Sequence, residues 1–194
     1  MDLNELRNKA YKTACEHGFH DEELSNEHCL CLVISELMEA VEADRKGKRA
    51  NVELFKLWQN NPLSISEETR IKMFKQDLEE FIKDSVEDEL ADAAIRLLDL
   101  AGYRGIAIET FTEEMIYEST ESCNDESFTE SIYAIATIPV RFEYEYDYSF
   151  DKQLNSMLLG IIGLSNYMGI DLLWHVEQKM RYNELRENKH GKKY

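Results

Sequence analysis

The sequence predicts an all-α fold, a helical bundle, and two observations support this class. Its 194 residues include only two prolines and eight glycines, the residues that interrupt helices most strongly. Several long segments also repeat apolar residues every three or four positions, which places them on one face of a helix. Because 43% of the residues are hydrophobic, the chain can bury a core. We expect residues 1–194 to form a single domain.

Two helices and a connection are expected in the N-terminal third. A first amphipathic helix covers about residues 2–17. Ser25, a residue type favoured at helix N-caps, precedes a second and longer helix that ends at Gly47. Residues 50–65 contain three asparagines and a proline, so we expect a connection there.

Three further helices are expected in the middle of the chain. Ser64 and Glu67 have the spacing of a capping box, which predicts a helix through about residue 83. Periodic apolar residues predict two more helices, over 85–105 and 107–121. The polar stretch TESCNDESFTES that follows is rich in turn-forming residues.

The sequence pattern of residues 133–150 does not decide between two local structures. Aromatic residues alternate with acidic ones there, as expected for an extended strand pair or an irregular loop, and Pro139 argues against a central strand. Two closing helices are expected over 151–168 and 170–189, separated by Gly169.

The charge of the chain excludes several classes of partner. It carries 39 acidic and 22 basic residues, a net charge of −17, which repels nucleic-acid polymers and anionic membranes. No apolar run approaches the roughly 18 to 20 residues that span a bilayer. The N-terminus lacks the basic start and apolar centre of a signal peptide. We therefore expect a cytoplasmic protein with neither nucleic-acid polymers nor membranes as partners.

Carboxylates on the second helix are the first functional signal. Glu36 and Glu39 lie one turn apart, opposite the main apolar stripe. Apolar and small residues share that opposite side, so the helix is expected to pack on two faces. Glu36 and Glu39 are therefore expected to point into a second contact instead of open water.

The helix over 85–105 carries a narrow polar ridge on an otherwise apolar surface. The ridge consists of five residues: Glu89, Asp92, Arg96, Asp99 and Tyr103. Charges confined in this way must be paired, hydrated in a cleft or bound to cations, because burying them bare is costly. The quartet Glu36, Glu39, Glu89 and Asp92 offers the hard oxygen donors that suit Mg²⁺, with Mn²⁺ as a second option. A salt-bridged surface closed by Arg96 is the alternative explanation.

Positive charge gathers near the C-terminus of this acidic chain. Lys179, Asn183 and Arg186 have the i, i+4 and i+7 spacing of one helix face. Beside a metal cluster, such a face could hold the oxygens of a polyphosphate substrate. A basic tail that interacts with a helix C-terminus is the alternative.

Three blocks of this sequence resemble a known family. They are SELMEAVEADRKGK (35–48), VEDELADAAIRLLDLAGYRGI (86–106) and GIDLLWHVEQKMRYNELRENKHGKK (169–193). They look like blocks of MazG-like proteins in the all-α nucleotide pyrophosphohydrolase superfamily, which includes dimeric dUTPases. Two segments, about 50–84 and 107–168, are longer than in compact relatives and are expected to be insertions.

The resemblance implies a fold, an activity and a set of site residues. The activity is Mg²⁺-dependent hydrolysis of a nucleoside triphosphate to the monophosphate and pyrophosphate by a homo-oligomer, a dimer. The family's metal ligands match Glu36, Glu39, Glu89 and Asp92, and Glu36 or Glu39 would orient the attacking water. The C-terminal pattern implies phosphate contacts from Lys179, Arg186 and Lys189, and sugar, base or phosphate contacts from Tyr182 and Asn183. Arg96 and Asp99 would fix the metal ligands in place.

Two other functions stay open. The fold could persist in a noncatalytic protein that binds nucleotide or serves an interaction. His20-Asp21 is the dipeptide of HD-type phosphohydrolases, although it lies in an expected loop and not on a helix.

Overall fold

The computed structural model describes residues 2–60 and 65–188, and the predicted all-α class is confirmed over them. They form ten helices and no strand. The helices are α1 (Leu3–Glu16), α2 (Asn26–Arg45), α3 (Val52–Gln59), α4 (Glu67–Phe81), α5 (Val86–Tyr103), α6 (Glu113–Glu121), α7 (Phe128–Ala136), α8 (Ile138–Tyr144), α9 (Phe150–Tyr167) and α10 (Leu172–Glu184).

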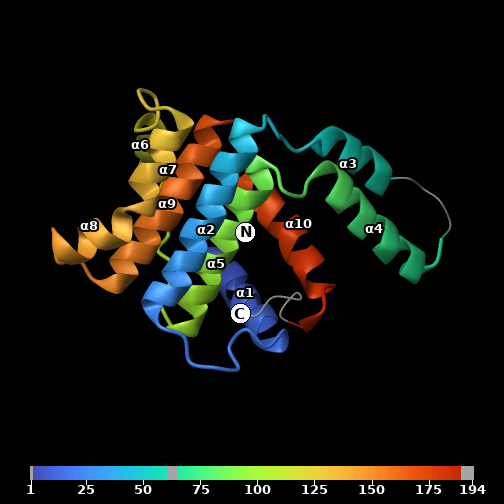
Figure 1. Cartoon of the computed structure of the whole chain (residues 1–194), viewed down its shortest axis with the longest axis horizontal. Helices are drawn as coiled ribbons and strands as arrows, with labels where there is room; N and C mark the ends of the chain where they lie inside the picture. Colours follow the sequence, from blue (N-terminus) through green and yellow to red (C-terminus); the bar gives the residue numbers. More distant parts are fainter. Residues whose placement is uncertain (1, 61–64, 189–194) are drawn as a thin grey trace.

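Helix α5 is the centre of the bundle. It contacts α1, α2, α9 and α10, and Figure 1 shows it in the middle of the molecule with α6–α9 on one side and α10 on the other. The reason lies in its sequence: apolar or small side chains such as Leu90, Ala94 and Leu97 cover most of its circumference and are buried. A helix that is apolar nearly all round has to be surrounded by other elements. Polar groups on α5 are consequently enclosed as well.

Helices α3 and α4 form a hairpin that projects from the bundle (Figure 1). The prediction of a bare connection over 50–65 is therefore wrong, because Asn51 caps α3 through its side chain and starts a helix there. The hairpin has its own small core, in which Phe55 and Phe74 pack with Tyr182 of α10. The N-cap of α4 is Ser66, whereas Ser64, the predicted cap, lies outside the described residues.

The segment left open over 133–150 contains the end of α7, the whole of α8 and a turn over 145–149, and it forms no strand pair. Ser127 and Glu130 form a complete capping box that starts α7 inside the stretch that seemed turn-rich. Pro139 occupies the first turn of α8, a position that tolerates proline because its missing N–H would have no partner there. The alternating aromatic and acidic residues cover the end of α8 and the turn after it, where the rings of Phe142, Tyr146 and Tyr148 pack on one another.

Two helix boundaries also differ from prediction. Helix α6 begins at Glu113 with Thr112 as its cap, so 107–112 is not helical. The last helix ends at Glu184, which places Arg186 beyond the helix.

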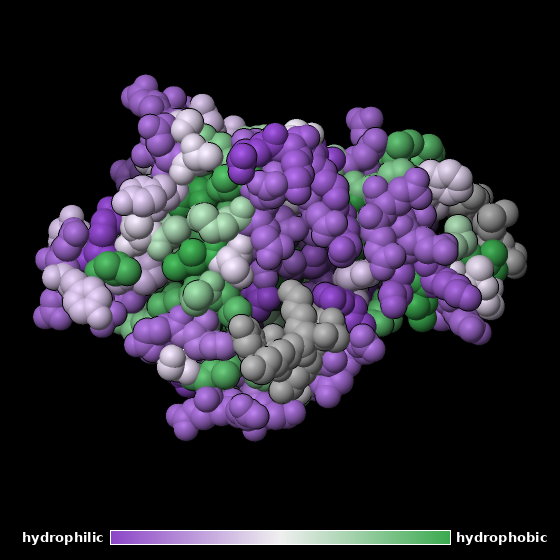
Figure 2. All heavy atoms as spheres, in the orientation of Figure 1, coloured by the Kyte–Doolittle hydropathy of each residue, from purple (hydrophilic) through white to green (hydrophobic). Residues whose placement is uncertain are grey.

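The outer surface is mostly hydrophilic on the face shown in Figure 2, with a strip of apolar side chains where α2 runs beside α7 and α9. Among residues 2–60 and 65–188, no single helix is both long and apolar enough to cross a membrane. Helices α9 and α10 meet the length and composition criterion only as a pair bent by 113°.

Candidate functional site

The candidate site is built on the first two turns of α5. Ser85 caps this helix by accepting a hydrogen bond from the Asp88 backbone N–H at 3.2 Å, and acidic residues follow directly. The extensive contact between α2 and α5 brings Glu36 of α2 to the same place. Because α5 is enclosed, the carboxyl groups on these turns are buried with it: Glu36, Asp88 and Glu89 are each at most 5% exposed.

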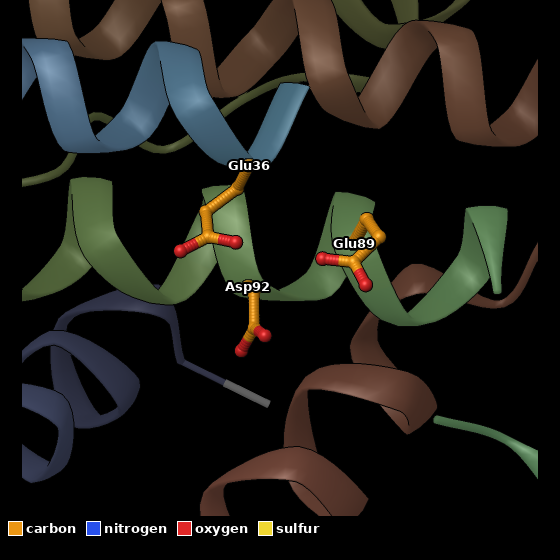
Figure 3. A group of neighbouring side chains, drawn as sticks. All are labelled: Glu36, Glu89 and Asp92. Atoms are coloured by element: carbon orange, nitrogen blue, oxygen red, sulfur yellow. The ribbon is translucent and has the colours of Figure 1, made fainter. Parts of the chain in front are cut away.

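Three carboxyl groups meet at the α2–α5 contact. Glu36, Glu89 and Asp92 each offer an oxygen atom within 4.8 Å of the other two, and Figure 3 shows the three groups in a triangle. Within the part of the chain that the structure describes, the carboxyl group of Glu89 makes no hydrogen bond and no ion pair, although only 5% of the residue is exposed. A buried carboxyl group without a protein partner is the feature expected of a metal ligand.

The electrostatics of the triangle favour a bound cation. Burial, together with neighbouring Asp92 and Asp88, raises the pKa of Glu89 to about 8. Burial also raises the pKa of Glu36, although the guanidinium of Arg96 opposes this rise. Without a cation, the triangle therefore holds a proton at neutral pH, which a divalent ion would displace.

Lys179 of α10 is buried against α5 and neutralises two carboxylates. Its Nζ lies 2.7 Å from an oxygen of Asp88 and 2.7 Å from an oxygen of Asp92. Burial alone would lower the pKa of Lys179, but Asp92 and Asp88 outweigh burial and raise it. Asp88, whose pKa burial raises to about 6, also accepts a hydrogen bond from the Asp84 backbone N–H at 3.0 Å. Lys179 thus contacts carboxylates and does not point into open space.

The two residues expected to support the ligands do so in different ways. Arg96 donates from Nε to Glu36 and lies beside the triangle. Asp99 accepts from His20 Nε2 at 2.7 Å, one turn farther along α5. The ring of His20 packs against Tyr103 with centroids 4.4 Å apart. Asp99 therefore positions the loop that carries His20, and the HD dipeptide serves this contact.

The remaining predicted site residues separate into three groups. Glu39 is exposed and lies outside the triangle. Tyr182 is buried and donates its hydroxyl to Glu79 of α4 at 2.7 Å, so it anchors the projecting hairpin. Asn183 and Arg186 line the cleft described next, and Lys189 lies outside the described residues.

One site residue escaped the sequence analysis. Asp88 lies one position before Glu89, off the polar ridge of α5, and becomes part of the site through Lys179 of α10. Its position four residues before Asp92 is a signal that could have revealed it, because that spacing places both carboxylates on one side of a helix.

A cleft opens beside the triangle. Its empty space, including the open mouth, is about 980 Å³, and Glu36, Asp92 and Arg96 lie on its wall. Apolar side chains from four helices and the α1–α2 loop form much of the remaining lining, among them Ala10, Phe19, Leu24, Leu32, Ile95 and Met180. Oδ1 of Asn183, another lining residue, is buried without a hydrogen-bond partner. The cleft could therefore hold an organic group with a few polar atoms next to a metal ion.

No protein-family model, no curated protein and no solved structure matches this chain. The geometry of the site and the resemblance of three sequence blocks are therefore the basis for a functional conclusion.

Proposed function

We propose that this protein is a nucleoside triphosphate pyrophosphohydrolase, which uses Mg²⁺ to hydrolyse a nucleoside triphosphate, a dNTP or a non-canonical NTP, to the monophosphate and pyrophosphate. One observation carries the proposal: three carboxyl groups, one of them buried without a partner, meet at the wall of a largely apolar cleft. The three blocks that resemble MazG-like proteins include parts of α2, α5 and α10, which are helices around this site. This arrangement supports the resemblance independently of the sequence match.

The donor set fits a magnesium ion. Glu36, Glu89 and Asp92 would hold the ion through carboxylate oxygens, the ligands that Mg²⁺ prefers, and water or phosphate oxygens would complete its coordination. When bound, Mg²⁺ would polarise phosphate oxygens and lower the pKa of a coordinated water. Mn²⁺ has similar ligand preferences and could replace it.

The protein's own residues would orient the substrate and balance charge. Lys179 holds Asp88 and Asp92 in place through two ion pairs, and Arg96 holds Glu36 in the same way. The cleft would bind the nucleoside, with apolar side chains against the base. The unpartnered Oδ1 of Asn183 would accept a hydrogen bond from it. Glu36 and Glu39 both remain candidates for orienting the attacking water.

The decisive experiment measures the products. The protein is incubated with Mg²⁺ and each common dNTP and NTP, and phosphorus NMR distinguishes pyrophosphate from orthophosphate. We expect pyrophosphate and the nucleoside monophosphate from at least one nucleotide. Two orthophosphates per monophosphate would contradict the proposal, and nucleotide binding without turnover would favour the noncatalytic alternative.

Variants then test the ligand set. Asp92→Asn and Glu36→Gln should abolish turnover while helical content by circular dichroism is retained, because each removes a charged oxygen donor. Glu118→Gln, on the exposed surface of α6, is the matched control and should keep full activity. Glu39→Gln should reduce turnover less than Asp92→Asn, because Glu39 is exposed outside the triangle.

A further inference from the structure

A group of basic side chains borders the carboxylates at the N-terminal end of α5. Lys48 Nζ lies 3.3 Å from Asp84 Oδ2, and Lys83 Nζ lies 3.0 Å from Asp84 Oδ1. Arg49 Nε lies 2.8 Å from Glu87 Oε1. Three cations thus pair with two acids, a local concentration of basic side chains in a chain whose net charge is −17. The function proposed above assigns no role to these three residues.

The basic group is connected to the metal triangle through Asp84. Asp84, Asp88 and Glu89 each offer an oxygen within 4.8 Å of the other two, and Glu89 also belongs to the triangle with Glu36 and Asp92. The cleft begins on the other side, because Glu36 and Asp92 line it. The carboxylates therefore have an apolar neighbourhood on one side and a cationic one on the other.

The backbone that carries these cations is held firmly in place. The Val86 N–H donates to the Lys48 carbonyl at 3.2 Å, and the Ala50 N–H donates to buried Glu87 at 2.9 Å. The lysine side chains remain accessible, with 47% of Lys48 and 38% of Lys83 exposed. Their partner Asp84 is 58% exposed, and exposed ion pairs of this kind are worth at most about 1 kcal/mol. A ligand that carries more negative charge than Asp84 can therefore take over both ammonium groups.

We propose that Lys48, Lys83 and Arg49 form the binding site for the terminal phosphates of the substrate, that is, for the pyrophosphate that leaves. This inference rests on the proposed function, because it places the nucleoside in the cleft and the α-phosphate at the triangle. The β- and γ-phosphates then extend toward the N-terminus of α5, whose positive dipole end adds to the attraction. Asp84 holds the two lysines in position while no substrate is bound.

The test uses magnesium pyrophosphate, which reports on this site whatever base the enzyme prefers. Its Kd is measured by isothermal titration calorimetry for the wild type, for the double variant Lys48→Met/Lys83→Met, and for Lys46→Met. Lys46 is 64% exposed and pairs with Glu42 on α2, so it is a matched control with the same loss of charge. Arg49 is left intact because it anchors buried Glu87.

We expect the Kd of the double variant to rise at least about tenfold, since two charge-assisted contacts are lost, and that of Lys46→Met to stay within about twofold. An unchanged Kd in the double variant, an equal rise in Lys46→Met, or no binding to the wild type would overturn the inference. If the wild type also releases pyrophosphate from a nucleotide, each of these results leaves the proposed function standing. A lysine-dependent Kd in a protein without turnover would instead support the phosphate site and contradict the hydrolytic function.

Discussion

Replacing Glu89 by glutamine should stabilise the ion-free protein at alkaline pH. Glu89 is buried beside two other carboxyl groups and has no protein partner among the described residues. Glutamine has nearly the same shape and no charge, so the substitution removes the cost of ionising this group inside the fold. A residue retained at such a cost is expected at a functional site.

The size of the effect follows from the pKa. Burial, with Asp92 and Asp88, raises the pKa of Glu89 to about 8, against 4.5 for a free glutamate. Each pKa unit corresponds to about 1.4 kcal/mol, so ionisation costs the folded state up to about 5 kcal/mol. Water entering from the cleft reduces this to about 2 to 4 kcal/mol.

The direction in pH is fixed by linkage. Well below pH 4.5, Glu89 is protonated in both the folded and the unfolded chain and contributes no penalty. At pH 4.5 half of the unfolded chains have lost this proton, and the penalty is about 0.4 kcal/mol. As the pH rises from 4.5 to 8, the unfolded chain releases this proton first, and the folded state loses relative stability. The difference between Glu89→Gln and the wild type should therefore be small at pH 4.5 and complete at pH 9.

Urea unfolding in EDTA at the two pH values measures this difference. Glu39→Gln is the matched control, because Glu39 is exposed on the neighbouring helix, and its effect should stay within about 0.5 kcal/mol. Adding Mg²⁺ at pH 9 should raise the stability of the wild type more than that of Glu89→Gln. A difference of the same size at both pH values would refute the reasoning, because the effect would then come from packing and not from charge.

Three other substitutions test the contacts around the site. Lys179→Met removes the cation that pairs with buried Asp88 and half-buried Asp92 and should cost about 3 to 5 kcal/mol in urea unfolding; a neutral result would show that these ion pairs add no net stability. Tyr182→Phe removes the hydroxyl that anchors the α3–α4 hairpin and should cost about 1 kcal/mol with KM unchanged, whereas a raised KM would restore Tyr182 as a substrate contact. Gly163→Ala places a Cβ 2.7 Å from the Ser119 backbone. This clash should reduce the free energy of unfolding by about 1 to 3 kcal/mol and so lower Tm; an unchanged Tm would show that α6 moves away freely.

Helical periodicity predicts well which face of a helix a side chain lies on, but it predicts poorly which side chains of two helices come into contact. Glu89 and Asp92 could be placed on one ridge of α5 because residues three apart must share a side of a helix. Glu36 could be placed toward a second contact because α2 is apolar on two sides. Glu39 shares that helix, but α5 crosses α2 beside Glu36, so one carboxylate is buried and the other is exposed. The crossing point depends on tertiary packing, which the sequence pattern does not contain.

The same limit applies elsewhere in the chain. The Tyr-Asn pattern of the resemblance assigns Tyr182 and Asn183 alike to the substrate, yet the two side chains point to different parts of the molecule, one to the α4 hairpin and one to the cleft. Residues 142–148 alternate as a strand would, but local caps decide the structure upstream: Ser127 starts α7, and Pro139 fits the first turn of α8. Capping residues were a better guide there than alternation.

The net charge of −17 does not extend unchanged into the site. Lys179 and Arg96 form ion pairs with three of the four acids at the α5 contact, namely Asp88, Asp92 and Glu36. The fourth acid, Glu89, retains a proton at neutral pH because its pKa is about 8. A divalent ion that displaces this proton adds one net positive charge to the site. The surface can therefore repel nucleic-acid polymers while the site accepts a small anion, provided that the anion arrives with its metal ion or after it.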